Sequence, residues 1–382
     1  MKIAVIQNED VSSGGAFSAE VYFTTVLEEL SRQKNVEFHI LKIQHTLLSS
    51  VLAQADRLVI ELFKSILFGQ LLRKWNIVYF SKLERKLNRK GIDFVIFFGN
   101  YNQMALLSKI PFVVCIWDLG HRDLVGFPET YQLGRFEFRE RGIQEATSKA
   151  FKVLTDSYKT SSRLESIYGV EMNRSLPVTL FPPESHSILS SIPKKRKVNF
   201  QKFVLYPANF WKHKNHQVLV EALNYNLSSS IESFDLIFVG SDKGNKESVF
   251  KLVEKYGLQE KVKFLDFVAR TELLRLYNDC SALVYPSLLG PTNIPPLEAV
   301  MHGIKVFVAT GAASNLIGFK GVYEICPHDT LAWAKALEMR KTETKNFSGI
   351  NSSSVRKLHQ VNVENLQALL AEMQDYVRPL GR

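Results

Sequence analysis

Basic side chains crowd one short segment in the second half of the chain, YPANFWKHKNHQVLVEAL. Lys212, His213, Lys214 and His216 lie where an apolar run ends and a helical pattern begins near Asn215. Because the N-terminal end of a helix carries positive partial charge, several cations placed there cost stability unless an anion binds. The segment therefore predicts a phosphate site. A basic loop that simply faces water is the alternative.

Two further loops contain residues suited to a bound ligand. After the first apolar run, Gly14 and Gly15 allow close approach to the backbone before a helix that begins near Ser18, although a structural turn is the alternative. The later segment GPTNIPPLEAVMHG places two prolines and Glu298 in the first turn of a helix. A helix N-terminus favours a carboxylate in any case, so Glu298 alone does not distinguish ligand binding from helix stabilisation.

These loops follow short apolar runs that alternate with segments of helical spacing. The first half supplies KIAVIQ, FVIFFG, FVVCIWD and KVLTD, and the second supplies FVLYPAN, DLIFVG, VKFLDF, ALVYPS, IKVFVA and VYEIC. Buried parallel strands joined by crossover helices have this pattern. It predicts an α/β protein with two Rossmann-like, doubly wound domains, whose ligands lie at the carboxyl ends of the strands.

The length of 382 residues also favours two domains, because it exceeds what one hydrophobic core usually organises. A Ser- and Lys-rich stretch predicts a linker at residues 186–200, between an N-terminal domain (1–185) and a C-terminal domain (201–360). Residues 361–382 predict a closing helix that packs back on the N-terminal domain. The linker contains PKKRKV, a nuclear-import-like string, but no nucleic-acid-binding signature accompanies it, so we expect no nucleic-acid partner.

Composition favours a soluble globular protein, with 46% hydrophobic and 23% charged residues. The sequence has no signal-peptide core and no run of about 18 apolar residues that could span a membrane. Cys115, Cys280 and Cys326 lie in apolar runs, which suits buried thiols in a reducing compartment. We therefore expect a cytoplasmic protein. Its net charge of +10 favours anionic partners in general.

One segment could bring the protein to the inner face of the plasma membrane. Residues 52–90 combine apolar positions with nine basic and three acidic residues, which suits a peripheral helix on anionic lipid. A core-facing helix with a solvated basic face is the alternative.

The loops around Lys214 and Glu298 together resemble those of the retaining GT-B glycosyltransferases of family 4 type, the glycosyl transferases group 1. This family includes sucrose synthases and bacterial mannosyl- and rhamnosyltransferases. YPANFWKHKNHQVLVEAL is similar to its donor-phosphate loop, and YPSLLGPTNIPPLEAVMHGIKVFVA to its donor-sugar and ribose loop. The resemblance covers nearly the whole chain and is weakest over residues 45–90. It implies a GT-B fold, with two Rossmann-like domains facing a central cleft.

In the phosphate loop, the resemblance implies that Lys214 contacts the diphosphate of the donor and serves catalysis. Asn209 stands where many members have an arginine, so one expected diphosphate partner is replaced. We expect Asn209 to border the donor, and His213 or Lys212 to compensate for the missing arginine.

In the sugar and ribose loop, the resemblance implies that Glu298 holds the ribose hydroxyls. Many members have a second glutamate eight positions earlier, and Gly290 occupies that position here. We therefore expect Thr292 and Asn293, together with backbone amides, to contact the donor sugar.

The segment FVVCIWDLGHRDLVGFPE resembles an acceptor-side loop in which many members carry a His-Asp pair. Trp117 stands at the histidine position and Asp118 at the aspartate position. We expect Asp118 and the nearby His121 to be catalytic residues that face the sugar.

The resemblance implies transfer, with retention, of a hexose or deoxyhexose from a GDP-, dTDP- or UDP-linked donor. Mannose or rhamnose is favoured, with a glycan or lipid-linked oligosaccharide as acceptor in O-antigen or related polysaccharide synthesis. No metal or cofactor is implied. A sugar-nucleotide 2-epimerase of the same architecture is one alternative. A non-catalytic sugar-nucleotide-binding subunit is another, suggested by Gly290, Asn209 and Trp117.

Overall fold

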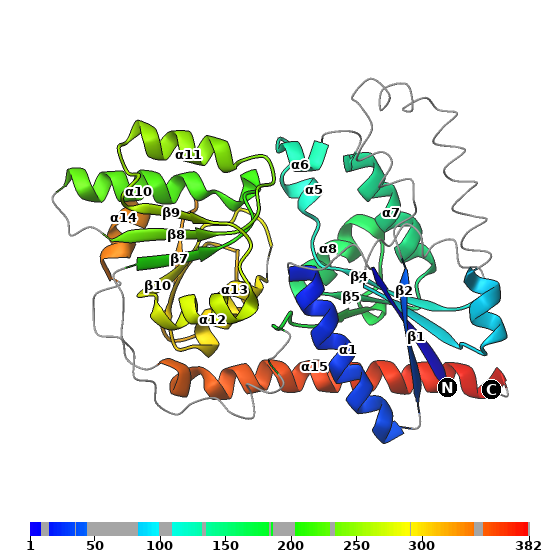
Figure 1. Cartoon of the computed structure of the whole chain (residues 1–382). Helices are drawn as coiled ribbons and strands as arrows, with labels where there is room; N and C mark the ends of the chain where they lie inside the picture. Colours follow the sequence, from blue (N-terminus) through cyan, green and yellow to red (C-terminus); the bar gives the residue numbers. More distant parts are fainter. Residues whose placement is uncertain are drawn as a thin grey trace. The chain divides into compact units, whose positions relative to one another are not determined.

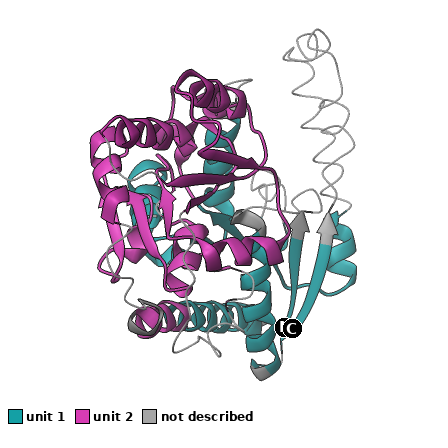
Figure 2. Cartoon of the chain, turned by 60° about the vertical axis from the view of Figure 1, so that its left-hand side comes forward, with its two compact units in different colours: residues 1–117, 137–178, 361–382 teal, residues 118–136, 179–360 magenta. Residues whose placement is uncertain are grey.

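In the computed structural model the chain forms two compact units, each made of several segments. The described residues are 1–8, 15–34, 36–43, 83–98, 109–131, 135–182, 185, 203–229, 234–290, 292–339 and 347–380. Unit 1 comprises residues 1–117, 137–178 and 361–382, and unit 2 comprises residues 118–136 and 179–360 (Figure 2). Residues 118–136 therefore group with unit 2, although they lie within the N-terminal domain predicted from the sequence.

Unit 1 is built on a parallel six-stranded sheet of order β2-β1-β3-β4-β5-β6 (Figure 1). Every residue of β3 and β4 is buried, which explains why these strands are continuous apolar runs in the sequence. The strands are β1 (Lys2–Asn8), β2 (Glu37–Ile43), β3 (Phe94–Phe97), β4 (Phe112–Ile116), β5 (Lys152–Thr155) and β6 (Ser175–Pro177).

Three main helices accompany this sheet: α1 (Gly15–Lys34), α7 (Arg135–Lys149) and α8 (Tyr158–Tyr168). Helix α1 begins at Gly15, earlier than the start near Ser18 that the sequence predicted. Helix α8 has the ends that its sequence dictates. Ser157 accepts from the Thr160 N–H at its start, and Gly169, with a φ of +68°, ends it.

Unit 2 has a second parallel six-stranded sheet, of order β12-β11-β10-β7-β8-β9. From β7 the chain proceeds to one edge through β8 and β9. It then returns to the other side of β7 with β10 and proceeds to β12. The strands are β7 (Phe203–Pro207), β8 (Asp235–Val239), β9 (Val262–Leu265), β10 (Ala282–Tyr285), β11 (Lys305–Ala309) and β12 (Val322–Ile325).

This strand order puts a topological switch point between β7 and β10. The helices of unit 2 include two short ones from the segment 118–136 (Figure 1). They are α5 (Gly120–Asp123), α6 (Pro128–Tyr131), α10 (His216–Ser228), α11 (Lys246–Lys255), α12 (Arg270–Asp279), α13 (Ile294–Met301) and α14 (Thr330–Glu338). The predicted α/β class with two doubly wound parallel sheets is confirmed.

The long helix α15 (Phe347–Val377) belongs to unit 2 up to residue 360 and to unit 1 from residue 361. In unit 1, the Asn365 amide donates to the carbonyl of Pro177 at 2.8 Å, and the Gln374 amide donates to the carbonyl of Lys34 at 3.0 Å. Buried residues recur at helical spacing along this part, namely Leu366, Leu369, Leu370, Met373 and Val377.

Three predictions from the sequence concern membrane association and the cysteines. No helix that the structure describes is long and apolar enough to cross a bilayer. The predicted membrane segment, residues 52–90, lies outside the described residues as far as residue 82 and stays a prediction. Cys115 and Cys280 are buried as expected, whereas Cys326 is exposed, which corrects the expectation for that thiol.

Candidate functional site

The switch point in unit 2 brings together the two loops with the strongest sequence signals. Strands β7 and β10 pair in parallel, with Ala282 opposite Val204 and Leu283 opposite Leu205. The chain leaves both strands at the same edge of the sheet, into the loops 208–215 and 286–293. Open α/β sheets bind ligands in the crevice at this point.

The side chain of Lys214 lies between these loops. Its ammonium donates to the hydroxyl of Tyr285 at 3.1 Å and to the Ser287 hydroxyl at 3.2 Å, and lies 5.1 Å from the centroid of the Tyr285 ring. Ser287 donates in turn to the carbonyl of Leu289 at 2.9 Å. Among the described residues, no carboxylate forms an ion pair with Lys214. A cation held by neutral groups is well suited to an anionic ligand.

The lysine ends a 3₁₀ turn, Lys212–Lys214, that leads into α10. Asn215 follows in the left-handed conformation, with a φ of +54°, which Asn tolerates better than most residues. Its amide donates to the carbonyl of Pro327 at 2.8 Å. Helix α10 begins at His216, and the Tyr206 hydroxyl donates to the carbonyl of Lys214 at 2.6 Å.

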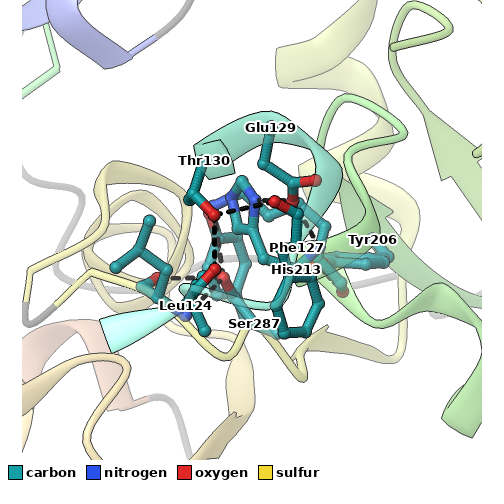
Figure 3. Close-up of polar contacts among 10 residues, drawn as sticks. Leu124, Phe127, Glu129, Thr130, Tyr206, His213 and Ser287 are labelled. Carbon is teal, nitrogen blue, oxygen red and sulfur yellow. Dashed lines mark hydrogen bonds and ion pairs between the residues drawn. The ribbon is translucent and has the colours of Figure 1, made fainter. Parts of the chain in front are cut away.

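His213 is held by Glu129, a residue of α6. The backbone N–H of His213 donates to Glu129 Oε1 at 3.0 Å, and its ring Nδ1 lies 2.7 Å from the same oxygen (Figure 3). Because a carboxylate only accepts, we assign the proton of the ring to Nδ1. The side chains are only 11% and 10% exposed. The Leu288 N–H donates to the carbonyl of His213 at 2.9 Å, so both backbone groups of His213 are bonded.

Burial makes both histidines of this segment neutral. Burial and the neighbouring Lys214 lower the pKa of His213 to about 4, and burial lowers the pKa of His216 to about 3. Burial acts to raise the pKa of Glu129, but hydrogen bonds from its own backbone and from His213 outweigh burial, so the pKa lies below its usual value. The positive charge of the segment at neutral pH thus comes from its two lysines, not from all four basic residues.

Glu298 is the fifth residue of α13 and is 5% exposed. One of its oxygens lies 2.6 Å from the guanidinium of Arg270, and the other accepts from the Tyr277 hydroxyl at 2.6 Å. The sequence placed Glu298 in the first turn, which is wrong, because no acidic residue lies in the first turn of α13. Its contacts are with α12, so helix-dipole stabilisation does not explain why this carboxylate is buried.

The position of the absent second glutamate has a special backbone. Gly290 has a φ of +98°, and a Cβ there would lie 3.0 Å from the amide nitrogen of Asn293. That amide donates to the carbonyls of Gly290 and Ala312, and its oxygen accepts from the Tyr285 hydroxyl at 3.0 Å. The side chain of Asn293 therefore occupies the space beside Gly290. Thr292 is buried, at 6% exposure.

The residue at the usual arginine position contacts the protein itself. Asn209 accepts from the Ser241 N–H at 2.9 Å, which ties the loop after β7 to the end of β8. Gly240 allows this close approach, because a Cβ there would lie 2.4 Å from the carbonyl oxygen of Ala208. Neutral His213 does not supply the missing positive charge. Lys212 is exposed and remains the candidate for that role.

The two predicted acceptor-side residues belong to the segment that groups with unit 2. Asp118 accepts from the Gly120 N–H at 2.7 Å, and His121 is 1% exposed, with its ring 5.4 Å from that of Phe136. A Cβ on Gly120 would lie 2.5 Å from the Leu289 side chain, so this segment packs on the loop after β10. The catalytic roles of Asp118 and His121 stay predictions.

The remaining predicted site residues belong to unit 1. Gly14 lies outside the described residues, and Gly15 is the first residue of α1. Trp117, at the histidine position of the family, stacks on Phe23 with a centroid distance of 5.7 Å.

Sequence reasoning missed several residues that complete the site. None of them had a recognised role in the motifs, and two of them, Arg270 and Tyr277, lie outside the segments that carry the resemblance. They are Glu129, Tyr206, Phe210, Arg270, Tyr277, Tyr285 and Ser287.

The family comparison covers the segment that holds most of these groups. Residues 189–315 match the family described as glycosyl transferases group 1. We refer to this matched segment as the group 1 domain. This group 1 domain contains Lys214 and Glu298, which match the family pattern, and Gly290, which departs from it.

Two curated relatives extend the comparison of the group 1 domain. The chain is 29% identical over 196 residues to the O-antigen chain mannosyltransferase RfbU of Salmonella typhimurium, covering 51% of this chain and 52% of that protein. It is 23% identical over 184 residues to the O-antigen chain mannosyltransferase B of Escherichia coli, covering 47% and 48%. The match thus spans about half the length of these relatives.

Solved structures resemble the whole chain. The Anabaena protein HepE, crystallised with UDP, aligns with a TM-score of 0.63 at 15% identity, covering 98% of this chain and all of that one. Sucrose-phosphate synthase of Thermosynechococcus elongatus aligns with a TM-score of 0.67 at 16% identity, covering both chains fully. These similarities confirm the predicted GT-B fold around the group 1 domain.

Proposed function

We propose that the protein is a hexosyltransferase that uses a nucleoside diphosphate sugar as donor and a glycan as acceptor. One observation carries the proposal: the Lys214 ammonium lies at the switch point of a group 1 domain, held by the hydroxyls of Tyr285 and Ser287. Neutral partners position the cation and leave its charge for a diphosphate.

In the proposed reaction, the bond between the sugar anomeric carbon and the diphosphate oxygen breaks. The negative charge that develops on the leaving diphosphate is stabilised by Lys214 and by the N-terminus of α10. The acceptor hydroxyl forms the new bond from the same face, and its proton passes to the leaving phosphate. Retention, and the absence of a metal requirement, are parts of this proposal.

Glu298 is proposed to hold the ribose. Its carboxylate is fixed by Arg270 and Tyr277, so the direction of its two acceptor oxygens is defined. Asp118 and His121 are proposed to face the sugar. Their segment packs on the loop after β10, which supports their placement near the donor within unit 2.

Mannose is the proposed sugar, because two relatives are named O-antigen chain mannosyltransferases. Rhamnose is the second choice. The proposed acceptor is a glycan or lipid-linked oligosaccharide, and the proposed location is the cytoplasm, with residues 52–90 at the inner face of the plasma membrane. The proposed donor nucleotide is GDP, dTDP or UDP; UDP is the nucleotide bound in the structure of the neighbour HepE.

Incubation with GDP-, UDP- and dTDP-linked sugars and a panel of glycan acceptors tests the proposal. Transfer to an acceptor supports it, with the anomeric configuration of the product deciding retention. Conversion of the donor to its 2-epimer would instead indicate the epimerase, and tight binding without turnover would indicate a non-catalytic subunit. Chelation with EDTA should leave transfer unchanged.

A further inference from the structure

The turn that carries Lys214 is fixed from several elements of unit 2 at once. Tyr206 of β7 donates to the Lys214 carbonyl, and Leu288, in the loop after β10, donates to the His213 carbonyl at 2.9 Å. The third support comes from Glu129 in α6, which accepts from both the backbone and the ring of His213. This last support is 84 residues away in the sequence.

We infer that Glu129 is a positioning residue: it holds His213, and through that turn the Lys214 ammonium, where the donor diphosphate binds. The inference rests on the proposed function of Lys214. Its geometric basis is that one carboxylate oxygen accepts two N–H groups of the residue adjacent to the lysine. A single torsional change at residue 213 would move the base of the lysine side chain.

The pair differs from an ordinary surface ion pair. Both side chains are about nine-tenths buried, so solvent does not compete strongly for the hydrogen bonds. The histidine is neutral, so its contribution is a directed N–H bond to a charged acceptor, which is stronger than a bond between neutral groups.

The helix that carries Glu129 is itself held in place. Thr130 donates to the carbonyls of Leu124 and Phe127, which closes the turn before α6 (Figure 3). Gly120 lies against Leu289, so the same segment also contacts the loop that contains Ser287. The segment 118–136 thus supports both loops that hold the Lys214 ammonium.

Four variants test this role: Glu129→Ala, Glu129→Gln, His213→Ala and the double variant Glu129→Ala/His213→Ala. Thr147→Val is the matched control, because it removes a buried hydroxyl bond, to the carbonyl of Ile143 in α7, from a residue outside the segment 118–136. The quantities measured are the dissociation constant for the best-bound of GDP, UDP and dTDP, the KM and kcat of transfer, and the melting temperature.

Glu129→Ala removes both hydrogen bonds to His213 and should raise the nucleotide dissociation constant and the donor KM at least about tenfold, since one charge-assisted hydrogen bond alone is worth about that factor. Glu129→Gln should stay within about threefold of wild type, because its amide oxygen can accept both N–H groups. Thr147→Val should lower the melting temperature and leave the dissociation constant unchanged. The double variant should bind no more weakly than the weaker single variant, because both act through one contact.

Wild-type nucleotide affinity in Glu129→Ala would overturn the inference, whatever its melting temperature. So would additive losses in the double variant. A protein whose wild type binds none of the three nucleotides would contradict the proposed function itself. If the wild type binds and transfers but Glu129→Ala does so equally well, only the positioning role fails.

Discussion

The Lys214 ammonium and the Tyr285 hydroxyl lie 3.1 Å apart, and the same hydroxyl donates to Asn293 at 3.0 Å. Tyr285 therefore links the two loops of the switch point: it accepts from the cation of one and donates to the residue before α13 in the other. The series of hydrogen bonds continues from the Asn293 amide to the carbonyl of Ala312, which follows β11. Carboxyl ends of three neighbouring strands are joined by neutral groups around a single cation.

Replacing Lys214 by Ala should lower transfer by about a hundredfold or more, because it removes a preorganised charge that stabilises the leaving diphosphate. The measurement is kcat/KM with the best donor. Lys251→Ala is the control: this lysine of α11 is exposed and pairs with Glu247 of the same helix, so its loss should have a much smaller effect. Near-wild-type turnover in Lys214→Ala, or equal losses in the two variants, would contradict the assignment.

Tyr285→Phe keeps the aromatic ring beneath the ammonium but removes the hydroxyl that bonds both loops. The Lys214 ammonium should then be less fixed, and donor KM should rise several-fold, on the scale of about 1 kcal/mol for a hydrogen bond. The fold should remain, because the ring keeps its contact with Tyr206. Measuring KM beside the melting temperature separates the two effects, and an unchanged KM would show that Ser287 alone suffices.

The strands and the donor loops could be predicted because their signals are local. Strands β3 and β4 are buried at every residue, so their apolar runs directly mark a parallel sheet. Lys214 and Glu298 were found by spacing within one motif each. The start of α10 was predicted to within one residue, since Asn215 precedes it.

The missed features depend on contacts distant in sequence or on burial. No pattern near His213 indicates that Glu129 would accept from it, because the two residues meet only through the tertiary fold. The neutral state of His213 and His216 follows from burial, which a basic-looking sequence conceals. Glu298 was expected in the first turn but is the fifth residue of α13, because two prolines indicate the start of a helix only approximately.

Glu298→Gln should affect both stability and nucleotide binding. The carboxylate is buried and bonded by Arg270 and Tyr277, so its loss should lower the free energy of unfolding by about 1–3 kcal/mol. Tyr277→Phe is the comparison: it removes one of the two bonds that fix the carboxylate but keeps the carboxylate itself, so it should weaken nucleotide binding less than Glu298→Gln does. Equal loss of affinity in both variants would contradict a ribose-binding role.

Gly290→Glu should not create the second glutamate of the family. A φ of +98° costs a residue with a side chain about 1–2 kcal/mol, and its Cβ would crowd the Asn293 amide. Gly290→Ala and Gly290→Glu should both lower the melting temperature and transfer. Gly126→Ala is the control, since nothing lies within 4 Å of its added Cβ. Higher activity in Gly290→Glu would show that this loop adapts to the common family arrangement.

The stability of unit 2 should fall as the pH is lowered below the ordinary histidine pKa of about 6.5. His213 and His216 have pKa values of about 4 and about 3 in the folded protein, so the unfolded chain binds more protons across that window. Each histidine should cost on the order of 1.4 kcal/mol per pH unit while the pH lies between its folded and unfolded values. The lowered pKa of Glu129 acts in the same direction below about 4.5.

Melting temperatures between pH 7.5 and 5 measure this dependence. The charges of Lys214, Glu129 and Asp118 affect the pKa of His213, and those of Lys214 and His213 affect the pKa of His216. The pKa values of both histidines therefore depend on the same group of charges. His213→Gln keeps a donor toward Glu129 but does not titrate, and it should remove about half of the pH dependence if the two histidines contribute equally. A slope unchanged in that variant would mean that His213 titrates normally and is not buried as a neutral partner of Glu129.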